Sequence, residues 1–143
     1  MDTLAVWMRL SRVKSLDQII QRKLMIKAEL ESCMLPGSMR FDGDKVQATP
    51  RDKLSELAIQ LANLDADLER LMERKAEAIK DTADLIELLD DETEKLVLAG
   101  FFIARMTARR IGEQIHYSPR RVYYFRSTAM KKLVDKLGEN CTA

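Results

Sequence analysis

The chain has 143 residues, of which 46% are hydrophobic and 33% charged, with only five Gly and three Pro. These values exclude a disordered or collagen-like chain, and the length suits one globular unit or two small ones rather than a multidomain enzyme. The net charge of +1 conceals two opposite segments, because residues 51–94 carry 6 Lys/Arg against 14 Asp/Glu whereas residues 105–137 carry 9 against 2. A short basic segment of this kind is typical of a surface that binds a polyanion.

The first predicted element is a long helix over residues 4–35. Its apolar residues recur at helical spacing, and three further apolar residues widen the same face. The first group is Leu10, Val13, Leu16, Ile20 and Leu24, and the second is Ile19, Ile26 and Leu30.

A second long helix is predicted from Asp52 to Leu89. Its leucines fall at alternating steps of three and four, which is typical of a coiled-coil seam. Asp52, after Pro50 and Arg51, places a carboxylate in the first turn, where the helix dipole favours it. The seam consists of Leu54, Leu57, Leu61, Leu64, Leu68 and Leu71, continued by Ala78, Leu85 and Leu89.

The segment between these helices, residues 36–51, is rich in Pro, Gly and Asp. Such residues favour turns, and the segment is long enough to let the two helices fold back on each other. We therefore predict that residues 1–90 form an antiparallel helical hairpin, a coiled coil. Because its apolar character extends to more than one side, we expect the chain to dimerise through this hairpin into a four-helix bundle.

A short apolar helix is predicted next, beginning after Asp91. Residues 96–98 and 101–103 are apolar, so almost no polar face remains, and a helix of that kind is buried. Gly100 in its interior lowers helix stability, which indicates that another helix approaches its backbone there. We expect the carboxylates of residues 90–92 to cap this helix and not to bind a metal ion.

The residues from Thr107 onward fit a helix-turn-helix. Thr107 can cap a short first helix in which Ile111 and Ile115 point inward, and Gly112 permits a close crossing. Ser118 followed by Pro119 is a start signal for a second helix. The turn position often filled by Gly holds a His, residue 116, which adopts a left-handed conformation less comfortably. We predict an all-α fold in which a helix-turn-helix domain over residues 91–138 follows the hairpin and precedes a flexible tail, residues 139–143.

The second helix of this domain is expected to bury Val122, Phe125, Ala129 and Leu133 and to expose a basic, aromatic face. An Arg at the start of such a helix suits bidentate hydrogen bonding to guanine in the major groove. The expected base contacts come from Ser118, Arg120, Arg121, Tyr123, Tyr124 and Ser127. Phosphate contacts, which fix the register on the duplex, are expected from Thr107, Arg109, Arg110, Arg126, Lys131 and Lys132.

Residues 91–137 resemble region four of bacterial sigma factors. The resemblance rests on Met106-Thr107, on residues 110–115 with the sequence Arg-Ile-Gly-Glu-Gln-Ile, on Tyr117-Ser118 and on residues 129–133. The whole chain is similar to small phage-encoded proteins of Gram-positive bacteria, including the Asp44-Lys45-Val46-Gln47 segment. These proteins are grouped near the ArpU and RinA type of late transcriptional regulators. The resemblance implies a phage or prophage transcription regulator whose sigma-like module reads a promoter element.

The sequence offers few residues for enzymatic activity or metal binding. One His and two distant cysteines, Cys33 and Cys141, do not make a zinc site, and no Gly-rich phosphate loop is present. We therefore expect no enzymatic activity, metal or cofactor, and, without an export signal or a long apolar run, a cytoplasmic protein that does not enter membranes. The expected partner is double-stranded DNA. The alternative is a coiled-coil adaptor that binds RNA polymerase or another protein without reading DNA.

Overall fold

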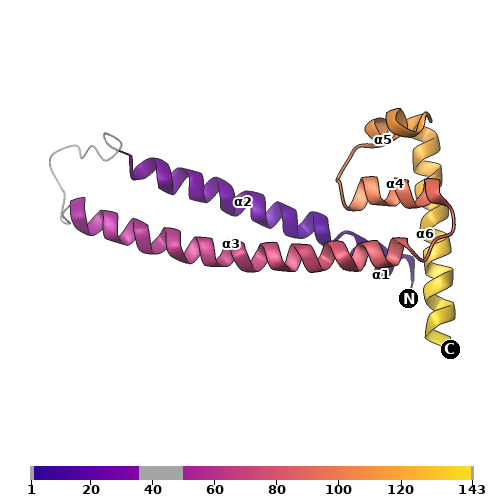
Figure 1. Cartoon of the computed structure of the whole chain (residues 1–143), viewed down its shortest axis with the longest axis horizontal. Coiled ribbons are helices and arrows are strands. Elements are labelled where there is room, and N and C mark those ends of the chain that lie inside the picture. The colour runs from indigo at the N-terminus through magenta and orange to yellow at the C-terminus, as the bar shows by residue number, and fades with distance from the viewer. Residues whose placement is uncertain (1, 36–49, 143) are drawn as a thin grey trace. The chain divides into compact units, whose positions relative to one another are not determined.

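A computed structural model describes residues 2–35 and 50–142 of the chain (Figure 1). Every regular element among these residues is a helix, which confirms the predicted all-α class. None of the described helices is long and apolar enough to span a lipid bilayer. Nearly all of the predicted loop 36–51 lies outside the described residues. The helices are α1 (Thr3–Leu10), α2 (Arg12–Cys33), α3 (Pro50–Ile86), α4 (Glu92–Phe102), α5 (Ala108–Ile115) and α6 (Pro119–Thr142).

Several helix bounds differ from the expected ones by one or two residues, and three differences are larger. The single helix predicted over residues 4–35 is divided at Ser11, the C-cap of α1, so that α1 can turn its own apolar side inward. The second long helix ends at Ile86, three residues before the expected Leu89. The expected flexible tail is instead helical as far as Thr142, because α6 continues without a break.

The chain divides into two compact units, and the division differs from the predicted boundary at residue 90. The head unit comprises residues 1–16 and 75–143, and the two-helix unit comprises residues 17–74. The reason is apolar packing: Val6, Leu10 and Leu85 belong to the same buried core as residues of α4 and α6. The short helices of residues 91–138 therefore share their core with both ends of the segment that we assigned to the hairpin.

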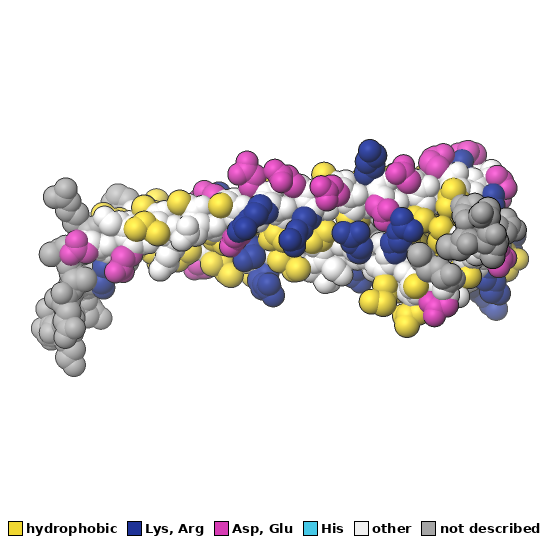
Figure 2. All heavy atoms as spheres, turned by 90° about the horizontal axis from the view of Figure 1, so that it is seen from below, with side chains coloured by type: hydrophobic (Ala, Val, Ile, Leu, Met, Phe, Trp, Pro, Cys, Tyr) yellow, Lys and Arg dark blue, Asp and Glu magenta, His cyan; other side chains and the backbone are white. Residues whose placement is uncertain are grey.

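In the two-helix unit, α2 and α3 run antiparallel (Figure 1). Two ion pairs mark the direction, because Lys23 Nζ lies 3.8 Å from Asp67 Oδ2 and Lys27 Nζ lies 2.8 Å from Asp65 Oδ1. Among the described residues of this unit, Ile20 and Leu68 are the only buried side chains. The other seam leucines of this unit are half-buried or exposed, namely Leu54, Leu57, Leu61, Leu64 and Leu71. Apolar side chains reach the surface on the face drawn in Figure 2.

The head unit is built around α6, which packs against α1, α4 and α5. Its core contains Leu10, Leu98 and Leu133, whose exposed fractions are all zero. An ion pair between α1 and α3 reinforces this arrangement: Arg9 Nε donates to Asp81 Oδ2 at 2.9 Å and Arg9 Nη2 donates to Asp81 Oδ1 at 2.7 Å. These hydrogen bonds hold the pKa of the Asp81 carboxyl below its ordinary value.

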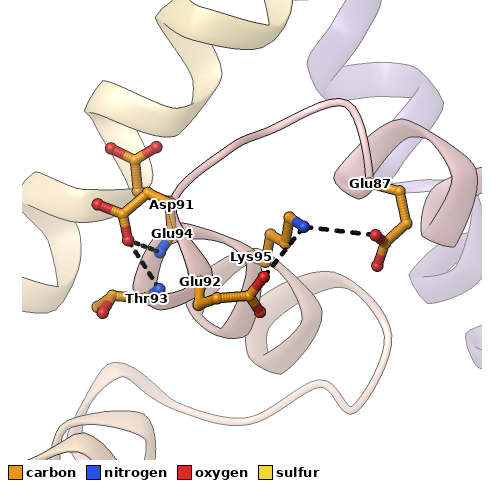
Figure 3. Close-up of polar contacts among 6 residues, drawn as sticks. All are labelled: Glu87, Asp91, Glu92, Thr93, Glu94 and Lys95. Carbon is orange, nitrogen blue, oxygen red and sulfur yellow. Dashed lines mark hydrogen bonds and ion pairs between the residues drawn. The ribbon is translucent and has the colours of Figure 1, made fainter.

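Asp91 caps α4, as predicted for the acidic residues before this helix (Figure 3). Its Oδ1 accepts hydrogen bonds from the backbone amides of Thr93 at 2.8 Å and Glu94 at 3.3 Å. In the same turn, Lys95 Nζ bridges Glu92 at 3.2 Å and Glu87 at 3.4 Å. A carboxylate at this position satisfies amides that have no partner within the helix, so Asp91 serves the helix terminus. Asp90, also expected to cap α4, instead accepts a hydrogen bond from Lys136 Nζ at 3.1 Å.

The expectation that α4 is buried on all sides is wrong in one respect. Val97, Leu98 and Phe102 are buried, but Leu96 is 46% exposed, and the inward position nearby is taken by Glu94, which is 3% exposed. A buried carboxylate needs a cationic partner. That partner is a residue of α6, described below.

Candidate nucleic-acid interface

A tight turn joins α5 to α6, and side-chain caps bound both helices. Thr107 Oγ1 accepts a hydrogen bond from the amide of Arg110 at 3.2 Å, and Ser118 Oγ accepts one from the amide of Arg121 at 3.2 Å. Between them, His116 adopts the left-handed conformation with φ 63° and ψ 41°. His116 therefore occupies the conformation that glycine usually supplies in such a turn, at the modest strain expected of a non-glycine residue.

Gly112 is required by the turn more than by the crossing of two helices. Its carbonyl accepts the amides of His116 and, at 3.0 Å, of Tyr117. A Cβ added at Gly112 would meet the carbonyl oxygen of Tyr117 well inside contact distance, whereas the nearest atom of α6, Val122 Cγ2, would lie at 3.5 Å. The turn backbone thus occupies the space that a side chain would need.

Gly100 marks the close approach that the sequence predicted. A Cβ at this position would lie 2.8 Å from Cδ1 and Cγ1 of Ile111, so α5 packs directly on the backbone of α4. Val97, Ile111 and Val122 form a small core there, with Phe101 and Phe125 packed against it. This core fixes α6 in the head unit through α4 and α5.

The buried side of α6 agrees with the prediction except at one residue. Val122, Ala129 and Leu133 have exposed fractions of zero, whereas Phe125 is only half-buried. The ring of Tyr117 packs edge-on against Phe125 with the centroids 5.1 Å apart. Tyr117, 46% exposed, therefore covers Phe125 at the surface and does not plug the interior of the turn.

The opposite side of α6 presents an outward stripe of four exposed residues at steps of four, three and four. These spacings put all four on one line along the helix. The outward stripe consists of Arg120, Tyr124, Ser127 and Lys131.

All six predicted base-contact residues are exposed, but they are not equivalent. Arg121 lies on one flank of the outward stripe with its guanidinium 4.8 Å from the centroid of the Tyr124 ring. Tyr123 lies on the other flank and stacks on Phe101 at 5.9 Å. The Ser118 hydroxyl is engaged as the cap of α6. A shallow hollow of about 250 Å³ brings together Ser118, Arg120, Arg121 and Tyr124.

Of the six predicted phosphate contacts, all but Arg126 are exposed. Thr107, Arg109, Arg110 and Lys131 are exposed, and Arg109 makes only a loose pair with Glu113 at 3.6 Å. Arg126 is half-buried instead, with its guanidinium 4.8 Å from the centroids of the Phe101 and Tyr123 rings and 5.1 Å from that of Trp7.

Lys132, the sixth predicted phosphate contact, has a partner within the fold. Its Nζ donates to Oε1 of Glu94 at 2.8 Å, and this hydrogen bond raises the pKa of Lys132 above its ordinary value. The Glu94 side chain is only 4% exposed, so Lys132 neutralises a carboxylate that would otherwise be buried without a countercharge. Lys132 reaches Glu94 from the side of α6 beside α4 while 48% of its side chain stays exposed, so it has a role in the fold, and its contact with a phosphate stays a prediction.

Two residues of α1 that we did not predict complete this surface. Thr3 and Trp7 lie beside α6 and line a second hollow of about 260 Å³ together with Arg126, Ser127, Met130 and Lys131. These residues are more than a hundred positions away from α6 in the chain, so no local pattern connects them. The one signal in the sequence is that Trp7 is the sole tryptophan of the chain.

No family model, curated protein or solved structure matches the chain. The similarity to sigma region four therefore stays a prediction from the residues that carry it. Among the described residues, no group of three or more His, Cys, Asp or Glu side chains is arranged to hold a metal ion.

Proposed function

We propose that α5 and α6 act as a helix-turn-helix, that α6 enters the major groove of DNA, and that the protein is a sequence-specific regulator of phage or prophage transcription. The observation that carries the proposal is the outward stripe of α6. It offers a guanidinium, a phenol, a hydroxyl and an ammonium group on one line, opposite the side on which Val122, Ala129 and Leu133 are fully buried. Residues 119–134 contain no acidic residue that would repel a phosphate backbone.

The roles follow from the chemistry of each side chain. Arg120, exposed in the first turn of α6, suits bidentate donation to O6 and N7 of guanine, and Tyr124 suits contact with a thymine methyl group or a phosphate. Arg109 and Arg110, exposed in the first turn of α5, suit the phosphate backbone beside the groove. Such contacts give affinity and orientation, whereas the base contacts give sequence preference.

Salt dependence tests the electrostatic part of the proposal. A head that neutralises about five phosphates should bind duplex DNA with a log-log salt slope near −4.5, because each neutralised phosphate releases a counterion. Fluorescence anisotropy of a labelled duplex at several salt concentrations measures the slope. Arg109→Gln should make the slope shallower by about one, and Lys80→Gln, a matched loss of charge among the acidic residues of α3, should leave it unchanged. A flat slope for the wild-type chain would contradict the proposal.

We also propose that the two-helix unit pairs with a second copy of the chain. Two buried side chains, Ile20 and Leu68, are few for a helical pair, and Met25 and Ile59 remain 70% and 62% exposed. A second pair of helices would cover such residues in a four-helix bundle. Sedimentation equilibrium of the full chain should give twice the monomer mass of 16.4 kDa. The double variant Met25→Glu/Ile59→Glu should sediment as a monomer, and a wild-type chain that stays monomeric at every concentration would refute the pairing.

A further inference from the structure

The hollow between α1 and α6 has the composition of an anion site. Lys131 and Arg126 supply two positive charges, Thr3 and Ser127 supply two hydroxyl groups, and Trp7 and Met130 supply apolar walls. No acidic side chain is among these lining residues. All of them belong to the head unit, and Ser127 and Lys131 are also the C-terminal half of the outward stripe.

Aromatic rings hold Arg126 in place at this hollow. Its guanidinium carbon lies 4.8 Å from the centroids of the Phe101 and Tyr123 rings and 5.1 Å from that of Trp7. Rings at these distances restrict the guanidinium through cation–π contacts, which do not use up its N–H donors. Because the side chain is already ordered, little further entropy is lost when it binds an anion. Arg126 is therefore a fixed donor and Lys131 a mobile one.

We propose that this hollow binds a backbone phosphate of the DNA duplex, on the side of the major groove opposite the phosphates near the start of α6. The inference rests on the proposed function and adds Thr3 and Trp7 of α1 to the DNA interface. Arg120 and Lys131 are eleven residues apart, so the outward stripe is about 16 Å long, and the major groove is about 12 Å wide. The stripe is thus long enough for its C-terminal end to reach the far backbone. The apolar walls match the deoxyribose next to that phosphate.

Trp7 gives a local readout of this hollow, because the chain has no other tryptophan. A duplex labelled with a dye that does not overlap tryptophan emission is titrated into the full chain while anisotropy and Trp7 emission are recorded together. Trp7 emission should change in step with anisotropy and saturate at the same duplex concentration. Inorganic phosphate at equal ionic strength should not reproduce the change.

Lys131→Gln tests the charge in the hollow, with Lys80→Gln as the matched control. Both residues are exposed, so neither variant should shift the midpoint of thermal unfolding. Lys131→Gln should make the salt slope shallower by about one and reduce duplex affinity several-fold at low salt, and it should weaken the Trp7 response. Lys80→Gln should match the wild-type chain in all three measurements.

The outcomes separate this inference from the function on which it rests. If the duplex raises anisotropy while Trp7 emission stays constant and the two variants behave alike, the phosphate site is wrong and the DNA-binding proposal stands. If inorganic phosphate alone gives the full Trp7 response, the hollow binds free phosphate and the assignment to the DNA backbone is wrong. If no duplex binds at any salt concentration, both proposals are wrong.

Discussion

A fragment of residues 91–143 is expected to stay unfolded, although it contains every residue of the predicted helix-turn-helix domain. Among the described residues, ten buried side chains form the core shared by α1, α4 and α6, and five of them lie outside this fragment: Val6, Leu10, Leu85, Ile86 and Leu89. Burial of an aliphatic side chain contributes about 2 kcal/mol, so the fragment loses on the order of 10 kcal/mol, as much as the whole stability of a typical domain.

Far-UV circular dichroism measures the helicity of the fragment, and urea titration measures whether it unfolds cooperatively. The full chain should show high helicity and a cooperative transition, and the fragment should show low helicity and no transition. Leu10→Ala in the full chain tests the same core by a smaller change. Because Leu10 has no exposed surface, this truncation should lower the free energy of unfolding by about 3 kcal/mol. Cooperative unfolding of the fragment, with native-like helicity, would show that residues 91–143 fold without α1 and α3 and that the domain boundary lies at residue 90.

Replacement of Gly112 by Ala is expected to destabilise the protein by about 3 kcal/mol. Alanine alone would favour the helix by up to about 1 kcal/mol, but the added Cβ would overlap the carbonyl oxygen of Tyr117. That oxygen belongs to the backbone of the turn and cannot rotate away as a flexible side chain would. For a chain of this size the cost corresponds to a fall of ~10 °C in the unfolding midpoint, measurable by calorimetry.

Gly138→Ala is the matched control for Gly112→Ala. A Cβ at Gly138 meets nothing within 4 Å, and the residue lies inside α6. The same substitution should therefore stabilise the protein by about 0.5–1 kcal/mol. We expect Gly112→Ala to lower the free energy of unfolding and Gly138→Ala to raise it. Equal changes would show that the α5–α6 turn does not require a residue without a Cβ at position 112.

The buried side of α6 was predictable from the sequence because it depends on helical periodicity alone. Residues 122, 129 and 133 fall on one side of any helix that begins at Pro119, whatever packs against it. The caps at Thr107 and Ser118 and the left-handed His116 follow from equally local chemistry. The residues of the outward stripe could be placed for the same reason.

The errors concern contacts between distant parts of the chain. The charge of Lys132 predicted only a phosphate contact, and its ion pair with Glu94 of α4, 38 positions earlier, could not be read from the sequence. Arg126 and Trp7 meet although they lie far apart in sequence, and no periodic pattern couples them. The boundary at residue 90 was wrong for a related reason, since a change from acidic to basic composition does not reveal which apolar residues share a core.

Selection from a pool of random duplexes tests sequence-specific reading by α6 most directly. Bound duplexes are recovered with the wild-type chain, with Arg120→Ala/Arg121→Ala and with Arg109→Ala, and they are then sequenced. We expect the wild-type chain and Arg109→Ala to enrich the same motif, and Arg120→Ala/Arg121→Ala to retain duplexes at low salt without enriching any motif. An unenriched pool from the wild-type chain, or an unchanged motif from the double variant, would contradict sequence-specific reading by α6.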